Sequence, residues 1–184
     1  SYVLRRGSLN EPMPYRLNRA IAWGSLPMAP PNDKGATQVP APPAELSGKL
    51  LELYSKGEWT ALVETAESAF PTAPLWLDLQ RWIAQGLGAL GQSHVAAQDA
   101  IIVDLAALLS FLPELAELSF DGGTPFASAE TLKWIKDEVL PRRGSSRSGS
   151  GSADLGSMGT PEALLEVAAE ARKLAARGQL AHAV

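Results

Sequence analysis

Few residues in this chain have the types and spacing for chemistry. Gly86, Gly88 and Gly91 spell G-x-G-x-x-G, a motif that binds the pyrophosphate of a dinucleotide when it follows a strand and opens a helix. Here the motif ends a helical pattern, and no strand pattern precedes it. We therefore expect these glycines to let two helices approach closely and then to end a helix.

The titratable side chains do not form a ligand set or an acid–base pair. His94 and His182 lie far apart in the sequence, and Asp99 and Asp104 point in different directions on a helix because they are five residues apart. Asp78 lies among apolar neighbours and is predicted to be a helix-start carboxylate satisfied by backbone N–H groups. The chain has no Cys, so it holds no thiolate nucleophile or ligand. These patterns predict a protein that is not an enzyme and that binds no metal or cofactor.

Composition indicates a globular protein with a real core. Hydrophobic residues make up 46% of the 184 residues and charged residues 20%. A net charge of -4 argues against a nucleic-acid partner, which normally selects a basic surface. No uninterrupted run of apolar residues approaches the roughly 18 residues that a membrane span needs, and no signal peptide is visible. We expect a cytoplasmic protein and, because the chain starts without Met and stops within a helical pattern, a piece of a longer one.

The central stretch, residues 74–113, predicts a helical hairpin. Apolar residues recur at three- and four-residue spacing, which is typical of a helix that buries one face. Gly91 interrupts the pattern, and helices joined by so short a turn must pack antiparallel. The repeated positions are Trp76, Leu79, Ile83, Leu87 and Leu90 before the break and Ile101, Leu105, Leu108 and Leu109 after it.

Further helices are predicted around this hairpin. They cover residues 15–23, 44–55, 58–70 and 128–140, the last with Ser128 as its N-cap. Residues 26–43 are rich in Pro and form a long loop, which is either a strap over the helical surface or an extended peptide ligand. The predicted fold is all-α: stacked antiparallel helical hairpins that resemble tetratricopeptide packing without its strict repeat, with a long Pro-rich loop.

Four residues near the ends of predicted elements are candidate interface residues. Arg16 and Arg19 are expected on the surface of the first helix, away from the side that carries Leu17, Ala20 and Ile21. Trp23 and Trp134 either fill the core or anchor a partner. The other tryptophans, Trp59, Trp76 and Trp82, are expected in the core.

Domain boundaries follow from composition. We expect a helical domain over residues 1–140, a flexible Gly/Ser-rich linker over residues 141–160, and a helix over residues 161–184 that Thr160 caps. Three arginines lie in the first part of the linker. They are expected to be solvated.

Three segments together resemble a known family. They are PYRLNRAIAW, WLDLQRWIAQGLGALG and LPELAELSFDGGTPFASAETLKWI, and they lie between Pro14 and Leu140. In this order they resemble the middle domain of the TssA proteins, which are related to ImpA and VasJ, of bacterial type VI secretion. The resemblance implies an all-helical module of a cytoplasmic contractile machine, and a final helix that leads to a C-terminal region which this chain lacks.

The resemblance also implies a function. TssA-like proteins form rings through a separate C-terminal domain and act at the baseplate and in assembly of the sheath and tube. The middle domain would bind itself, as a homodimer, and contact sheath, tube or baseplate proteins. The alternative, from the helical hairpins alone, is a generic adaptor that captures short peptides in a groove.

Overall fold

The computed structural model describes residues 8–142, which form packed helices and one short β-hairpin. The predicted final helix and nearly all of the predicted linker lie outside the described residues. The elements in chain order are α1 (Pro12–Trp23), β1 (Asn32–Asp33), β2 (Ala36–Thr37), α2 (Ala44–Lys56), α3 (Trp59–Ala69), α4 (Asp78–Ala89), the turn η2 (Gln92–His94), α5 (Val95–Phe111), the turn η3 (Pro113–Glu117), α6 (Ala129–Trp134) and the π-helical turn η4 (Ile135–Val139).

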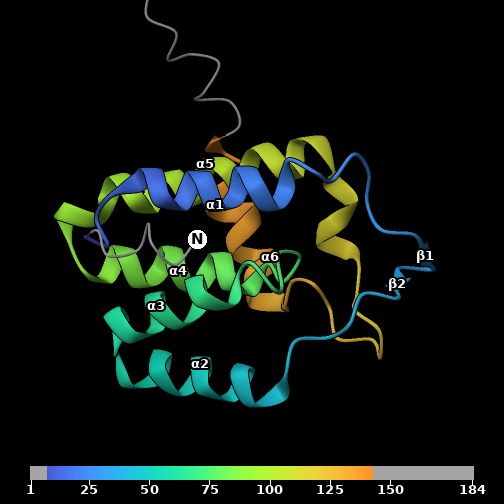
Figure 1. The fold of residues 1–184 in the computed structure, drawn as a ribbon, viewed down its shortest axis with the longest axis horizontal. Coiled ribbons are helices and arrows are strands. Elements are labelled where there is room, and N and C mark those ends of the chain that lie inside the picture. The colour runs from blue at the N-terminus through green and yellow to red at the C-terminus, as the bar shows by residue number, and fades with distance from the viewer. Residues whose placement is uncertain (1–7, 143–184) are drawn as a thin grey trace, which may run out of the picture. The chain divides into compact units, whose positions relative to one another are not determined.

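The helices α2, α3, α4 and α5 pack side by side in the order of the sequence, and α1 packs against α5. Figure 1 shows α2, α3 and α4 stacked in that order, with α5 and α1 beyond α4. Gly57 and Glu58 alone join α2 to α3, so these two helices must be neighbours. The predicted all-α architecture is confirmed.

Local signals explain where the helices begin and end. Pro12 and Pro14 lie in the first turn of α1, where a missing N–H costs nothing. Gly57 ends α2 in the left-handed conformation, at a φ of 69° that only glycine adopts without strain. The Ser128 hydroxyl accepts a hydrogen bond from the Thr131 N–H, so the predicted N-cap of α6 is confirmed.

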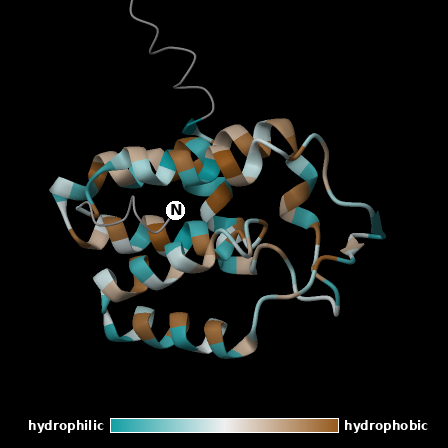
Figure 2. Cartoon of the chain, viewed as in Figure 1, coloured by the Kyte–Doolittle hydropathy of each residue, from teal (hydrophilic) through white to brown (hydrophobic). Residues whose placement is uncertain are grey.

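The central hairpin forms as predicted, with one shift at its start. α4 begins at Asp78, and Trp76 lies just before it, buried against Trp82 at 5.4 Å between ring centroids. Gly91 follows α4 with a φ of 97°, so the chain can reverse there into η2 and α5. The apolar residues of α4 and α5 form the middle of the core; brown segments on these helices in Figure 2 mark them.

Helix α5, with the turn before it, has an unusual composition. Residues Gln92–Phe111 are long and apolar enough to cross a membrane by length and composition alone. The helix packs against both α1 and α4 and carries buried Leu and Ile side chains along its length. These contacts are those of a core helix, which passes the same test of length and hydropathy.

The Pro-rich loop is a strap. Thr37 donates a backbone hydrogen bond to the Ser119 carbonyl at 3.0 Å, and Ser119 donates one to Gly35 at 2.8 Å. The Asp121 N–H donates to the Val39 carbonyl at 2.8 Å. The loop thus lies along residues 119–121, and the short antiparallel hairpin β1–β2, which the Pro-rich pattern did not predict, holds its middle.

The inner face of the helix predicted over residues 128–140, which the structure divides into α6 and η4, differs from the prediction. The spacing predicted Leu132, Ile135 and Val139 inward with Trp134 at the border. The structure buries Trp134, Ile135 and Val139 and leaves Leu132 exposed. The prediction for Leu132 is wrong because Thr131 takes the inward position, where its hydroxyl donates to the Asp78 carboxylate.

Gly86 provides a test of the close approach predicted for the glycine motif. A Cβ at Gly86 would lie 2.7 Å from Cγ2 of Val63 in α3, so Gly86→Ala is expected to lower the free energy of unfolding by about 1–3 kcal/mol. Urea denaturation of both proteins measures this difference. In the control Gly48→Ala, the new methyl meets nothing within 4 Å in exposed α2, and we expect a gain of about 0.5–1 kcal/mol from helix propensity. A Gly86→Ala variant as stable as the parent would show that α3 and α4 can move apart freely.

Candidate functional site

Helix α1 carries large aliphatic side chains on its outside. Met13, Leu17 and Ile21 are 69%, 41% and 65% exposed, and their spacing of four residues places them along one face of the helix. Ala20 is also exposed beside them. We call Met13, Leu17 and Ile21 the outer stripe of α1. Apolar side chains that gather on one exposed face are typical of a binding surface.

The inside of α1 carries two polar residues beside the aromatic residues Tyr15 and Trp23. Asn18 and Arg19 are buried, and Arg19 is only 1% exposed. The expectation that Arg19 lies on the surface is therefore wrong. The prediction failed because Arg19 has buried partners on helices that are distant in the sequence, and these partners cannot be recognised from local spacing.

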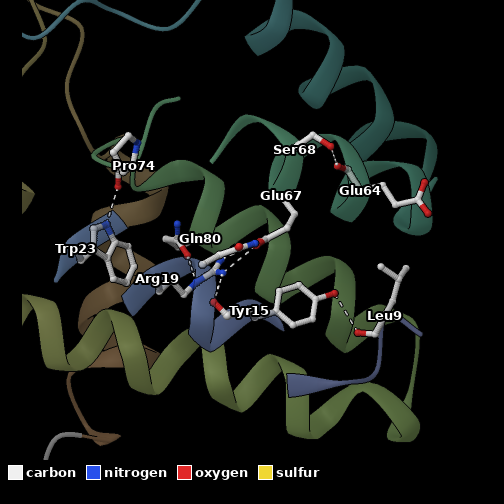
Figure 3. Close-up of polar contacts among 10 residues, drawn as sticks. Leu9, Tyr15, Arg19, Trp23, Glu64, Glu67, Ser68, Pro74 and Gln80 are labelled. Atoms are coloured by element: carbon white, nitrogen blue, oxygen red, sulfur yellow. Dashed lines mark hydrogen bonds and ion pairs between the residues drawn. The ribbon is translucent and has the colours of Figure 1, made fainter. Parts of the chain in front are cut away.

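Arg19 forms the centre of a buried polar cluster. Its guanidinium contacts both carboxylate oxygens of Glu67 in α3, with Nη1 to Oε1 at 3.2 Å and Nη2 to Oε2 at 3.1 Å (Figure 3). Nε donates to Oε1 of Gln80 in α4 at 2.9 Å. Asn18 donates to the same Glu67 oxygen as Nη1 does, at 2.9 Å. The bidentate geometry is the strong form of an Arg–carboxylate pair.

Aromatic side chains complete the attachment of α1. The Arg19 guanidinium lies 4.7 Å from the ring centroid of Phe70, in cation–π geometry. Trp23 packs edge-on against the same ring and donates from Nε1 to the Pro74 carbonyl at 2.9 Å. Tyr15 is buried and donates to the Leu9 carbonyl. Figure 3 shows Arg19 reaching from α1 to Glu67 and Gln80, Trp23 reaching to Pro74, and Tyr15 reaching to Leu9. The inner face thus fixes which side of α1 meets solvent.

The predicted interface residues are not brought together. Trp23 and Trp134 are buried, 8% and 5% exposed, in the core position that was one of the two alternatives for each. Arg19 is buried in the polar cluster, and only Arg16 is exposed. Burial raises the pKa of the Asp104 carboxyl in α5, while the charges of Arg16 and Arg19 act to lower it.

A second polar cluster joins α4 to α6. Asp78 accepts a hydrogen bond from the Ser128 backbone N–H at 2.9 Å, from the Thr131 hydroxyl, and from Trp76 Nε1 at 3.2 Å. Arg81 donates from Nε to the Thr131 hydroxyl at 2.8 Å. Asp78 was expected to be a helix-start carboxylate satisfied by backbone N–H groups. It lies at the start of α4 and accepts from a backbone N–H, that of Ser128 just before α6, so its role is to hold two helices together.

The other groups with possible chemistry show no catalytic arrangement in the described part of the chain. Gly86 lies at the contact with α3 and Gly88 against Gln98, as expected for helix approach. His94 shares a hydrogen bond with its neighbour Ser93. The Asp99 carboxylate forms an ion pair with the Arg142 guanidinium and not a carboxylate pair with Asp104. Residues 8–142 contain no group of three or more side chains suited to a metal ion. Sequence analysis placed Leu17, Ala20 and Ile21 on one side of the first helix, but it did not recognise that this side, together with Met13, faces outward.

Comparison with known proteins identifies the family. The sequence matches, over residues 1–184, the family described as Type VI secretion, EvfE, EvfF, ImpA, BimE, VC_A0119, VasJ. No curated protein matches the chain. The matched family is a structural component of type VI secretion and is not a known enzyme family. The match covers the whole chain and agrees with the resemblance carried by the three segments. The chain therefore belongs to the ImpA/VasJ family of bacterial type VI secretion proteins, a family related to TssA.

Proposed function

We propose that this chain is an assembly component of the type VI secretion system that acts in the bacterial cytoplasm. It binds a second copy of itself and contacts sheath, tube or baseplate proteins during their assembly. The helical part is the TssA-like middle domain, and residues 161–184 lead toward a C-terminal region. The observation that carries the proposal is the outer stripe of α1, an exposed apolar face on a member of a secretion-machine family.

The packing of the domain supports a role in protein contact. A buried ion pair holds α1 against α3, and a Trp hydrogen bond holds it against the loop between α3 and α4, so the outer stripe lies on a fixed support. A rigid, pre-arranged surface loses little conformational entropy on binding. The described polar clusters are internal and connect helices, which suits a scaffold better than a reactive site.

Affinity capture tests this function. Tagged residues 1–184 are produced in the source bacterium, and captured proteins are identified by mass spectrometry. We expect type VI sheath, tube or baseplate proteins, which Ile21→Glu should reduce if the outer stripe makes the contact. Leu51→Glu is the matched control, because Leu51 is an exposed aliphatic residue on α2, 55% exposed against 65% for Ile21. Recovery of unrelated peptides without machine proteins would contradict the assembly role and favour the alternative, a helical adaptor for short peptides.

A further inference from the structure

The strap, residues 26–43, pairs with residues 118–121 as one β-strand pairs with another. Ala36 and Ser119 form a parallel bridge, and the hydrogen bonds run between backbone groups. The three bonds, donor first, are Ser119 to Gly35 at 2.8 Å, Thr37 to Ser119 at 3.0 Å and Asp121 to Val39 at 2.8 Å. All of them leave residues 118–121 on one side, which we call the strap-facing edge. The strap thus occupies this edge as an added strand would.

Residues 118–121 are held in place without the strap. Leu118 and Phe120 are buried, and the centroid of the Phe120 ring lies 4.5 Å from that of Phe126. The Phe120 N–H donates to the Thr124 carbonyl at 2.7 Å, and the Phe126 N–H donates to the Leu118 carbonyl at 2.8 Å. Because these contacts do not use the strap, the strap-facing edge keeps its shape when the strap leaves.

The strap itself is weakly held. Thr37 is its only buried residue, and the Thr37 hydroxyl donates to the Ser119 carbonyl at 2.8 Å. The turn between β1 and β2 consists of Lys34 and Gly35, with φ angles of 50° and 89°. This is the type I′ pattern, in which Lys34 adopts a left-handed conformation that Asn or Gly adopts at lower cost. A segment with so little burial and a strained turn is expected to open while the helical core stays folded.

We propose that the strap-facing edge is a binding site for an extended peptide segment of a partner protein. The strap is the built-in occupant of this site and must leave before the partner binds. Addition of a strand to a free edge is a common mode of peptide recognition. The strap and the edge belong to other elements than the outer stripe of α1, so this binding goes beyond the proposed function and does not depend on self-association.

The strap shows which peptide fits the edge. Thr37 places a β-branched side chain in the buried position and a hydroxyl on the Ser119 carbonyl, and Val39, two residues later, is partly buried. A partner segment therefore needs Thr followed two residues later by an aliphatic residue, with its N–H available at the first of these positions. Glu117 and Asp121 are exposed at the two ends of the edge, so Lys or Arg beside this pattern is favoured over acidic residues.

Hydrogen exchange of the full 184-residue chain, resolved by NMR, tests whether the strap opens by itself. The Ser119 and Asp121 amides donate to the strap, whereas those of Phe120 and Phe126 do not. With rates corrected for intrinsic exchange, the first two amides are expected to exchange together and at least about tenfold faster than the other two. Equal protection of all four amides would mean that the strap opens only with the whole domain, which would overturn the proposed site.

Two variants should move this opening in opposite directions. Thr37→Val removes the hydroxyl and keeps the shape of the side chain, so the Ser119 and Asp121 amides should exchange about three- to tenfold faster. Lys34→Asn relieves the turn and should slow both amides. Gln38→Ala, at an exposed strap position, is the matched control and should change neither. If Thr37→Val accelerates the amides of the core helices equally, the domain is losing stability as a whole, and separate release of the strap is contradicted.

A synthetic peptide with the sequence of residues 32–41 tests whether the open edge binds a strand. The tethered strap acts at an effective concentration on the order of millimolar, so the peptide is added at about that concentration. In the Thr37→Val chain it should restore most of the lost protection of the Ser119 and Asp121 amides. The same peptide carrying Thr37→Pro lacks the N–H donor and should not. Faster exchange in Thr37→Val that the peptide fails to reverse would show an edge that opens but binds no strand, and the proposed site would be wrong.

Discussion

Replacing Glu67 by Ala is expected to lower the free energy of unfolding by about 3–5 kcal/mol, the largest effect of any polar substitution in this domain. The change leaves the Arg19 guanidinium buried, with its bidentate partner gone and only the oxygens of Gln80 and Tyr15 to accept its hydrogen bonds. An unpaired buried charge is costly because the protein interior cannot solvate it as water does. Urea denaturation followed by circular dichroism measures the loss.

Two comparisons show whether burial causes this effect. Glu52 and Lys56 form an exposed pair on α2 at 2.6 Å, and because water screens this pair, Glu52→Ala should leave stability close to that of the parent. The double variant Arg19→Met with Glu67→Leu should recover most of the loss, because no charge is then left unpaired. A loss below about 1 kcal/mol for Glu67→Ala would mean that Arg19 escapes to solvent and that α1 is not firmly held.

Glu67→Ala also connects stability with the proposed interface. If Arg19 and Glu67 hold α1 in its orientation, loosening them should weaken self-association although neither residue lies on the outer stripe. Arg19→Met with Glu67→Leu keeps a packed inner face and should retain the dimer. The difference in self-association between these two variants tests whether the inner face of α1 acts by holding the outer stripe in position.

Replacing Asp78 by Ala is expected to destabilise the domain by about 2–4 kcal/mol. The carboxylate accepts from the Ser128 N–H, the Thr131 hydroxyl and Trp76 Nε1, and each of these donors loses its acceptor. A buried donor left unpaired costs about 1–3 kcal/mol. The start of α6 should separate from α4, so hydrogen exchange at the Ser128 amide is expected to become faster. Chemical denaturation and hydrogen exchange measure the two effects.

A double-mutant cycle assigns this effect to the link between α4 and α6. Asp78→Ala and Thr131→Val share one contact, so their combined loss should fall short of the sum of the single losses by about 1 kcal/mol or more. Asp78→Asn keeps an acceptor oxygen and should cost less than Asp78→Ala. Strict additivity would indicate that the contact between Asp78 and Thr131 contributes nothing to stability.

Local signals were sufficient for much of the fold. The spacing of apolar residues predicted α2, α3, α4 and α5 within a few residues of their observed ends, because helix periodicity and turn residues such as Gly57 and Gly91 act over one or two turns. The core positions of Trp76 and Trp82 followed from the same periodicity. The family resemblance carried by the three segments agrees with the family match, because those segments retain specific residues and not composition alone.

The sequence by itself therefore determined the helices, their order and the absence of cysteine chemistry. Tertiary structure alone decided which side of α1 is buried, where Asp78 finds its partners, and that Thr131 displaces Leu132 from the inner face of α6. The physical reason is distance along the chain: Glu67 is 48 residues from Arg19, and Thr131 is 53 residues from Asp78. A buried charge is tolerated only beside such a partner. Glu67 is the partner of Arg19, so Arg19 lies in the core although local spacing placed it at the surface. The aliphatic side of α1 therefore faces outward.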